Sequence, residues 1–303
     1  MDVRQLEAFL AVIDHGSFSA AAEALFTVQS NVSTHVARLE DEIGAKLLDR
    51  RSRQLTPAGL AVEARARAAL HEISSIADEL ASLEDRVIGD VACGTTPSVG
   101  LWVLPSTLAA TTRDYPEVAI TIVEAQSDAL VNSLLTGELD LAITTHVRSP
   151  EVRFEPLFDE DIVAVLHPEH RLAANDSVTL DELSTETLLL PLPDNPLYGH
   201  IADAFARADV TLRAGLEVGS SALVSAMAAE GLGVALVPAT VALTSHELGG
   251  VRRPIADLAP REVTLTRREG QEVSTAVAVV AEILTATARL AAETMPGCRT
   301  RTV

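Results

Sequence analysis

The chain has 303 residues, too many for one small core, which predicts two or three domains. Apolar residues make up 48% of the chain but aromatic residues only 3%. The core is therefore expected to be aliphatic, and base stacking of the kind used by RNA and single-strand binders is disfavoured. The net charge of −20 is uneven, with −2 on residues 1–58 and −18 on the rest, so the acid load keeps the C-terminal part soluble and away from DNA.

The cysteines and the apolar segments bear on the compartment. Cys93 and Cys298 offer neither a disulfide framework nor a metal-ligand spacing, so we expect two unpaired thiols in a reducing cytoplasm. A redox switch between them is the alternative. The N-terminal stretch MDVRQLEAFLAVIDHGS carries acids inside its apolar run and no cleavage pattern, and no apolar run approaches the ~18 residues that a membrane span needs. The sequence predicts a cytoplasmic protein with no membrane partner, no metal and no cofactor.

The first 58 residues predict three helices. Residues 3–15 carry apolar side chains at helical spacing and end at a glycine. Ser17 or Ser19 can cap a short alanine-rich helix, and Thr27 can cap a third helix that runs to about residue 43. The second and third helices form a helix-turn-helix over about residues 18–37, an arrangement that places the second helix of the motif in a DNA major groove.

The third helix has two different faces. Its apolar stripe steps by four, three and four through Val32, Val36, Leu39 and Ile43. The opposite face presents Gln29, Ser30, Ser33, Thr34 and Ala37. An amide and short hydroxyls near a helix N-terminus suit the edges of bases in the major groove. A solvated face without a partner is the alternative, and the surrounding helix-turn-helix favours DNA contact.

Three arginines in four residues follow the third helix, and the next residues can form a small β-wing. Guanidinium groups at this place can bind phosphate or enter a minor groove. We expect Arg50 and Arg53 to contact DNA and leave Arg51 open. Surface ion pairs with Asp49 or Glu42 are the alternative.

Many residues of this head stand at a fixed spacing that is specific for one family. They are Leu6, Phe9, Gly16, Ser17, Phe18, Ala21, Ala22, Leu25, Gln29, Ser33, Leu39, Glu40, Gly44, Leu47, Arg50, Leu55, Thr56 and Gly59. The stretch resembles the N-terminal domain of LysR-type transcriptional regulators. The resemblance implies a winged helix-turn-helix over residues 1–58, with the amide and hydroxyls of the third helix and Arg53 on double-stranded promoter DNA. Val28 and Leu48 depart from the family's usual residues, which leaves the operator sequence open.

A long helix is predicted next, beginning at Thr56-Pro57. Its apolar positions step alternately by three and four through Ala66, Ala69, Ile73, Ile76, Leu80, Leu83 and Val87. This heptad seam predicts a coiled-coil linker over residues 59–88, with Ile73, Ile76, Leu80 and Leu83 in a dimer interface. A helix lying on its own domain is the alternative. The resemblance adds that dimers pair into tetramers.

Residues 89–303 alternate strands and helices, a rhythm that implies parallel sheets with ligands at the strand C-termini. We expect two α/β lobes with a cleft between them, lobe I over about 90–160 and 266–293 and lobe II over about 161–265, and a frayed tail from Met295. Three stretches, at 134–143, 154–173 and 231–238, resemble the effector domain of the same family. The resemblance implies the two-lobed fold of type 2 periplasmic binding proteins.

Polar residues just beyond the predicted strand ends are effector candidates. Helix N-termini that carry short hydroxyls bind carboxylates well, which favours a small organic anion. We expect the effector to contact Thr96, Ser98 and Thr145 from lobe I, and Ser220 and His200 from across the cleft. Simple helix capping is the alternative for each.

No catalytic residues are predicted. The stretch GLGVAL lacks the third glycine of a nucleotide loop, and the pair His167 and His170 in HPEH is more typical of a surface turn than of a metal site. The chain is thus predicted to be an α+β multidomain LysR-type regulator. It would bind an inverted-repeat promoter site under the control of a small-molecule effector, with RNA polymerase as a further candidate partner. A solute-binding or small-molecule enzyme module with a degenerate DNA-binding head is the alternative, and an architectural DNA protein is a third possibility.

Overall fold

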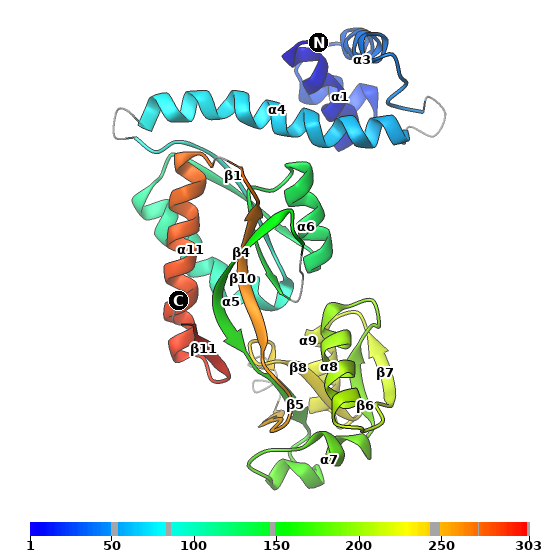
Figure 1. The fold of residues 1–303 in the computed structure, drawn as a ribbon, viewed down its shortest axis with the longest axis vertical. Coiled ribbons are helices and arrows are strands. Elements are labelled where there is room, and N and C mark those ends of the chain that lie inside the picture. Colours follow the sequence, from blue (N-terminus) through cyan, green and yellow to red (C-terminus); the bar gives the residue numbers. More distant parts are fainter. Residues whose placement is uncertain (50–53, 83–85, 146–148, 243–248, 272, 302–303) are drawn as a thin grey trace.

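The computed structural model describes residues 1–49, 54–82, 86–145, 149–242, 249–271 and 273–301. Figure 1 shows three tiers: a helical head on the long helix α4, then lobe I, then lobe II. The predicted fold class is confirmed in its helix-turn-helix head and its two-lobed α/β body. The coiled coil stays a prediction.

The head consists of α1 (Val3–His15), α2 (Phe18–Ala24) and α3 (Gln29–Ile43). Ser17 caps α2, because its Oγ accepts a hydrogen bond from the Ala20 backbone N–H at 3.1 Å. The predicted cap of α3 was wrong. Val28 occupies that position without a side-chain bond, and Thr27 Oγ1 instead accepts a hydrogen bond from Asn31 Nδ2 at 3.0 Å. The predicted stripe of α3 is buried in the head at Val32, Val36 and Leu39, whereas Ile43 is 38% exposed.

Helix α4 (Pro57–Ser82) is a single helix of 26 residues that leads away from the head. The predicted heptad seam divides along it, because Ala66 is buried in the head core and Ala69 packs against that core. Farther along, Ile73 and Ile76 are 46% and 58% exposed. The side chain of Leu80 and the whole of Leu83 lie outside the described residues. The exposed part of the seam therefore begins at Ile73.

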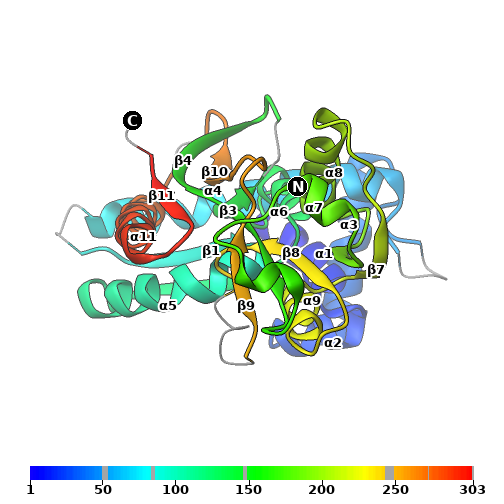
Figure 2. The ribbon, with the colours of Figure 1, turned by 90° about the horizontal axis from the view of Figure 1, so that it is seen from below.

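Lobe I is a six-stranded mixed sheet in the order β11-β4-β10-β3-β1-β2. Its strands are β1 (Gly89–Thr95), β2 (Val118–Glu124), β3 (Leu141–Thr145), β4 (Val152–Glu160), β10 (Arg261–Arg268) and β11 (Cys298–Thr300). Its helices are α5 (Pro97–Asp114), α6 (Ser127–Thr136) and α11 (Thr275–Thr294). As Figure 2 shows, α5 and α11 lie on one face of the sheet and α6 on the other, and each face has its own apolar cluster.

Lobe II is a five-stranded sheet in the order β7-β6-β8-β5-β9. Its strands are β5 (Ile162–Leu166), β6 (Leu188–Pro191), β7 (Ala214–Val218), β8 (Val234–Pro238) and β9 (Val251–Pro254). Its helical segments are the 3-10 turn η1 (Arg171–Ala174), α7 (Leu180–Ser184), α8 (Pro196–Arg207) and α9 (Ser221–Ala229). The α7 and α8 residues pack in one apolar cluster and the α9 residues in another.

The chain passes between the lobes twice, from β4 to β5 and from β9 to β10. The return to lobe I begins at Arg261, a few residues earlier than the sequence indicated. The tail that we expected to be frayed forms β11, which pairs antiparallel with β4. The Asp161 backbone N–H also donates to the Gly297 carbonyl at 2.7 Å. The C-terminal segment therefore lies directly on one of the two connections.

Helix α11 is an exception to the expectation that no apolar segment approaches the length needed to span a membrane. Within the described part of the chain it alone is long and apolar enough to cross a bilayer, with a mean hydropathy of 1.5 over its most apolar window. One face of this helix, which includes Val277, Val280 and Leu284, is buried in the core of lobe I. Packing in lobe I accounts for the apolar residues of that face.

Candidate functional site

The first candidate surface is the exposed face of α3. Gln29, Ser30, Ser33 and Thr34 all lie there, opposite the buried stripe. Ser19 Oγ donates to Gln29 Oε1 at 3.2 Å, and Thr34 Oγ1 donates to the Ser30 carbonyl at 2.7 Å. The structure therefore brings together the polar side chains that the sequence assigned to DNA.

Glu40, which is only 5% exposed, anchors the backbone at the start of the wing. Its carboxylate accepts hydrogen bonds from the backbone N–H of Leu47 at 2.9 Å and of Leu48 at 3.3 Å, and from Lys46 Nζ at 2.6 Å. Burial alone would raise the pKa of Glu40, but the bonds from Lys46 and the backbone lower it below its ordinary value. No pattern along the chain indicates this role. The predicted contacts Arg50 and Arg53 lie outside the described residues.

The wing also requires a residue without a side chain in the first turn of α4. Leu48 and Leu55 form a β-bridge, and the Thr56 backbone N–H donates to the Leu47 carbonyl at 2.9 Å. A Cβ on Gly59 would lie 2.1 Å from that carbonyl oxygen. Glycine therefore allows the helix to begin against the wing.

The second candidate site is a cavity of about 230 Å³ between the lobes. Side chains of both lobes and of their connections line it. They are Thr96, Pro97, Ser98, Leu101, Trp102, Gln126, Thr145, Asn195, Pro196, Leu197, Gly219, Ser220, Ser221, Ala222, Pro238, Thr240, Val241 and Arg261.

Four helices begin at this cavity. The N-cap residues of α5, α6, α8 and α9 are Thr96, Gln126, Asn195 and Ser220, and all four line it. Asn195 and Ser220 cap their own helices, at 2.9 Å to the Leu197 N–H and 3.4 Å to the Leu223 N–H. Thr96 and Gln126 make no such bond. Because each helix start carries about half a positive charge, the four together favour an anion.

Lobe I contributes two threonine hydroxyls to the lining of the cavity. The Thr96 hydroxyl is buried and has no hydrogen-bond partner among the described residues. The Thr145 hydroxyl lies 3.4 Å from Ser127 Oγ, which itself accepts a bond from the Thr145 backbone N–H at 2.9 Å. A buried hydroxyl without a partner is costly, so a ligand atom that bonds to Thr96 would be stabilising.

A buried ion pair at the edge of lobe I lies beside the cavity and contacts lobe II through Thr240. Arg261 is 4% exposed and Glu160 is fully buried. Arg261 donates to Glu160 Oε2 from Nε at 2.8 Å and from Nη2 at 2.6 Å, and Nη2 also donates to Ser98 Oγ at 2.9 Å. The other oxygen, Glu160 Oε1, accepts from the Thr240 N–H at 2.8 Å and the Thr240 hydroxyl at 2.6 Å. The chain of contacts runs from α5 in lobe I to the end of β8 in lobe II.

Four of the five predicted effector residues, Thr96, Ser98, Thr145 and Ser220, line the cavity. The structure places the fifth, His200, elsewhere. Its Nε2 lies 2.8 Å from the Ala259 carbonyl, and its pKa is lowered, first by burial and then by nearby arginines. Sequence reasoning missed Arg261, Gln126 and Thr240. No pattern along the chain connects Arg261 with Ser98, 163 positions away.

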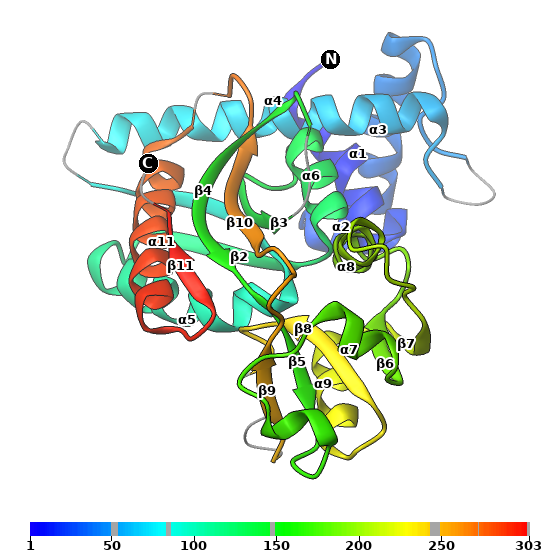
Figure 3. The ribbon, with the colours of Figure 1, turned by 60° about the horizontal axis from the view of Figure 1, so that its bottom comes forward.

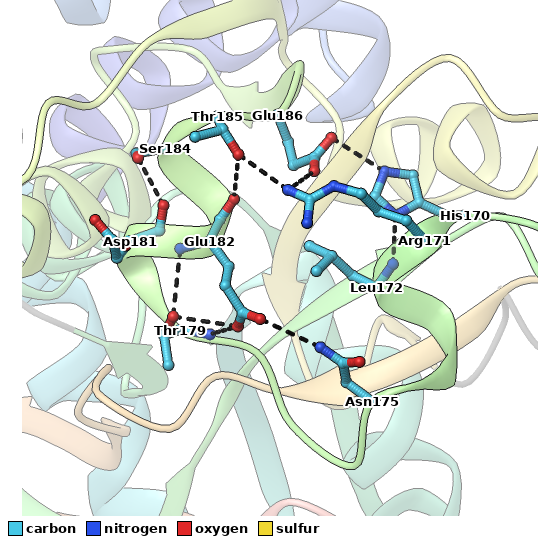
Figure 4. A network of polar contacts seen from close by, with 10 residues as sticks. All are labelled: His170, Arg171, Leu172, Asn175, Thr179, Asp181, Glu182, Ser184, Thr185 and Glu186. Carbon is cyan, nitrogen blue, oxygen red and sulfur yellow. Dashed lines mark hydrogen bonds and ion pairs between the residues drawn. The ribbon is translucent and has the colours of Figure 1, made fainter.

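The histidines of the HPEH stretch form local turns in lobe II. Nδ1 of His167 accepts from the Glu169 N–H and Nδ1 of His170 from the Leu172 N–H, both at 3.2 Å. Nε2 of His170 lies 3.2 Å from Glu186, within the polar network drawn in Figure 4. These bonds account for both histidines without a metal.

Both cysteines are buried in lobe I. Cys93 on β1 is 1% exposed and Cys298 on β11 is 8% exposed. Burial raises the pKa of Cys93 to about 12. Burial and the neighbouring Glu160 also raise the pKa of Cys298. Neither thiol is activated in this structure.

Two parts of the chain match models of known protein families. Residues 3–60 match the family described as "Bacterial regulatory helix-turn-helix protein, lysR family", and residues 85–289 match "LysR substrate binding domain". A hydrogen peroxide-inducible genes activator from Pectobacterium carotovorum is 32% identical over 259 residues, covering 83% of this chain and 84% of that protein.

Two solved structures resemble the whole chain. A full-length OxyR from Pseudomonas aeruginosa, with one cysteine replaced by aspartate, matches with a TM-score of 0.81 at 24% identity, covering 100% of this chain and 99% of that one. Full-length CbnR complexed with its target DNA matches with a TM-score of 0.68 at 22% identity, covering 95% and 100%. These likenesses concern the fold. Together with the family matches over head and body, they show that this chain belongs to the LysR family of DNA-binding transcriptional regulators and is not an enzyme.

Proposed function

We propose that this regulator binds an inverted-repeat promoter site through α3 and the wing, and that a small organic anion in the cleft between the lobes modulates this binding. The observation that carries the second part is the meeting of four helix N-termini at one cavity, next to a buried hydroxyl without a partner. Helix starts and hydroxyls are the groups that bind carboxylates in proteins.

The lining also indicates the shape of the effector. An anionic group would accept hydrogen bonds from Thr96 and Ser98 at the start of α5. The lining also includes apolar residues, among them Trp102, Leu197 and Val241. Since the cavity holds about 230 Å³, it fits a compact molecule with one charged end and a short apolar body.

The names of the relatives favour a second function, a peroxide-responsive activator. Sensing by a thiol requires an accessible thiolate. With its pKa raised to about 12, Cys93 would be a thiolate in roughly one molecule in 10⁵ at pH 7. Cys298 is buried as well. The chemistry of these two cysteines therefore favours the anion over peroxide as the signal.

The DNA-bound form is proposed to be a homodimer, with dimers pairing into tetramers. Ile73 and Ile76 support this, because they are large apolar side chains that α4 leaves exposed on one seam. Two heads held by such a seam suit a two-fold operator. As a soluble DNA-binding regulator the protein would work in the cytoplasm, where promoter DNA and RNA polymerase are found.

The substitution Thr96→Val tests the anion site, because it removes a hydroxyl that has no partner and keeps the shape of the side chain. An effector is first found by footprinting the promoter of the protein's own gene with a panel of organic anions. Thr96→Val is then expected to weaken effector binding about 10-fold or more, as the loss of a hydrogen bond to a charged group does. Thr112→Val, an exposed site on the same helix, is the control.

Two outcomes would contradict the proposal. In the first, no anion alters the footprint, or the Thr96→Val protein binds the effector like its parent. In the second, peroxide alters the footprint and Cys93→Ser or Cys298→Ser abolishes that response, which would establish the second function.

A further inference from the structure

One arginine connects three parts of the molecule. Arg67 on α4 is 17% exposed on its side chain and lies among three carboxylates. Its Nη1 donates to Asp14 of α1 at 3.3 Å, and its Nη2 donates to Glu63 of α4 at 3.0 Å. Its Nε lies 3.5 Å from Glu138, which follows α6 in lobe I. We call these four residues the Arg67 junction, and it joins the head, the linker helix and lobe I.

The attraction within the Arg67 junction depends on a single cationic side chain, that of Arg67. One guanidinium faces the three acids of the junction, so without it Asp14, Glu63 and Glu138 would face one another as like charges. Burial would lower the pKa of Arg67, but the hydrogen bonds that it donates to Asp14 and Glu63 raise it above its ordinary value. The arginine therefore stays charged, and its attraction to Glu138 is the part that reaches the effector domain.

Lobe I approaches α4 closely at this point. Gly137, which ends α6 in the left-handed conformation at φ 78°, precedes Glu138. A Cβ built on Gly137 would lie 3.4 Å from the Ala68 backbone nitrogen, next to Arg67 in the chain. Figures 1 and 3 both show α6 directly beneath α4. The Arg67 junction thus sits where the effector domain touches the linker helix.

Part of the boundary beside the junction is open. A cavity of about 490 Å³ separates α4 from lobe I beside the junction. It is lined by Ala61, Ala64, Arg65, Leu135, Glu151, Arg268 and Glu269. Polar interfaces between domains with little apolar contact permit relative motion. The contact can therefore open when the junction is lost.

We propose that Arg67 is a positioning residue that fixes lobe I against the linker helix and the head, and that movement of lobe I in response to the effector reaches the head through it. The second half of this statement rests on the proposed function. Lobe I contributes Thr96 and Thr145 to the effector cavity, while the head is bound to α4 through Arg67 and the apolar core. A movement of the lobes relative to each other would thus alter the electrostatic attraction between Glu138 and Arg67. It would thereby alter the position of the two heads on DNA.

Charge reversal separates this role from simple packing. Arg67→Glu removes the only cation of the junction, and the double variant Arg67→Glu with Glu138→Arg restores the count of one cation and three acids with the charges of positions 67 and 138 exchanged. Glu63→Gln is the matched control, because the Glu63–Arg67 pair lies within α4 and joins no domains. Each full-length protein is footprinted on the operator with and without effector. The radius of gyration of the free protein is measured by small-angle X-ray scattering.

In the Arg67→Glu protein we expect loss of the effector-induced change in the footprint and a larger radius of gyration, with effector affinity changed less than about twofold. The double variant should recover both properties, and the control should keep them. An unchanged footprint response and radius in Arg67→Glu, or no recovery in the double variant, would overturn the proposal. If the parent itself responds to no effector, the proposed function fails, and the scattering comparison still decides whether Arg67 holds lobe I.

Discussion

The buried pair of Glu160 and Arg261 can be tested by the single change Glu160→Gln. The carboxylate accepts four hydrogen bonds, two from Arg261 on Oε2 and two from Thr240 on Oε1. A glutamine has one carbonyl oxygen and one NH₂ group. Its NH₂ group would therefore face the N–H or O–H donors of either Arg261 or Thr240, and no hydrogen bond could form there. The buried guanidinium also loses its counter-charge. Breaking a buried ion pair in this way costs about 3–5 kcal/mol.

The assay is urea unfolding of the full-length protein, followed by circular dichroism, with Glu155→Gln as the control. Glu155 lies on the same strand and pairs with Arg267 at 3.1 Å, but the two side chains are 35% and 24% exposed. An exposed pair is screened by water, so the control should lose less than about 1 kcal/mol. A loss in Glu160→Gln as small as that of the control would refute the view that this buried network of Arg261, Glu160 and Thr240 stabilises the fold.

Three further outcomes are expected. Because the pKa of Glu40 is lowered in the fold, its contribution to stability is present above the ordinary value of 4.5 and is lost as the pH falls below it. Thermal unfolding of the parent should therefore become more sensitive to acid than that of Glu40→Gln, and equal sensitivity would contradict the role of Glu40. Cys93 and Cys298 should react with a thiol reagent only after unfolding, and rapid modification of the native protein would contradict their burial. Operator affinity should fall by roughly 10³-fold or more between about 50 and about 200 mM salt, whereas effector affinity, which depends on buried groups, should change little.

The head could be predicted almost completely because its signals are local. Apolar spacing set the three helices, and Ser17 stands where a short helix needs an acceptor for its first N–H groups. The cap of α3 was misassigned because Thr27 and Val28 differ by one position and only the backbone decides between them. The role of Glu40 was not predicted, because its partners are backbone N–H groups of the wing and such bonds leave no pattern in the sequence.

The expectations for the C-terminal tail and for His200 differ from the structure for another reason. Residues from Met295 onward show no helical or strand period, and β11 forms only because β4, more than a hundred positions earlier, offers a free edge. His200 follows the predicted strand end closely enough to be a candidate, but it lies one turn into α8 and points to the Ala259 carbonyl. Proximity in sequence to a strand end does not decide which way a helical side chain faces.

The residues at the cavity could be predicted from the sequence, but the ion pair beside it could not. Parallel strands end at one edge of a sheet, so the polar residues after β1 and β3 had to converge, and Thr96 and Thr145 do. Glu160 ends β4 and Arg261 begins β10, and these two strands are neighbours in the sheet of lobe I although about a hundred residues separate them in the sequence. The proposed effector would meet hydroxyls that each lobe contributes and an arginine that is already neutralised by Glu160. On that proposal its affinity would come mainly from the helix starts and from Thr96, and a displacement of Ser98 would reach Thr240 in the other lobe through Arg261 and Glu160.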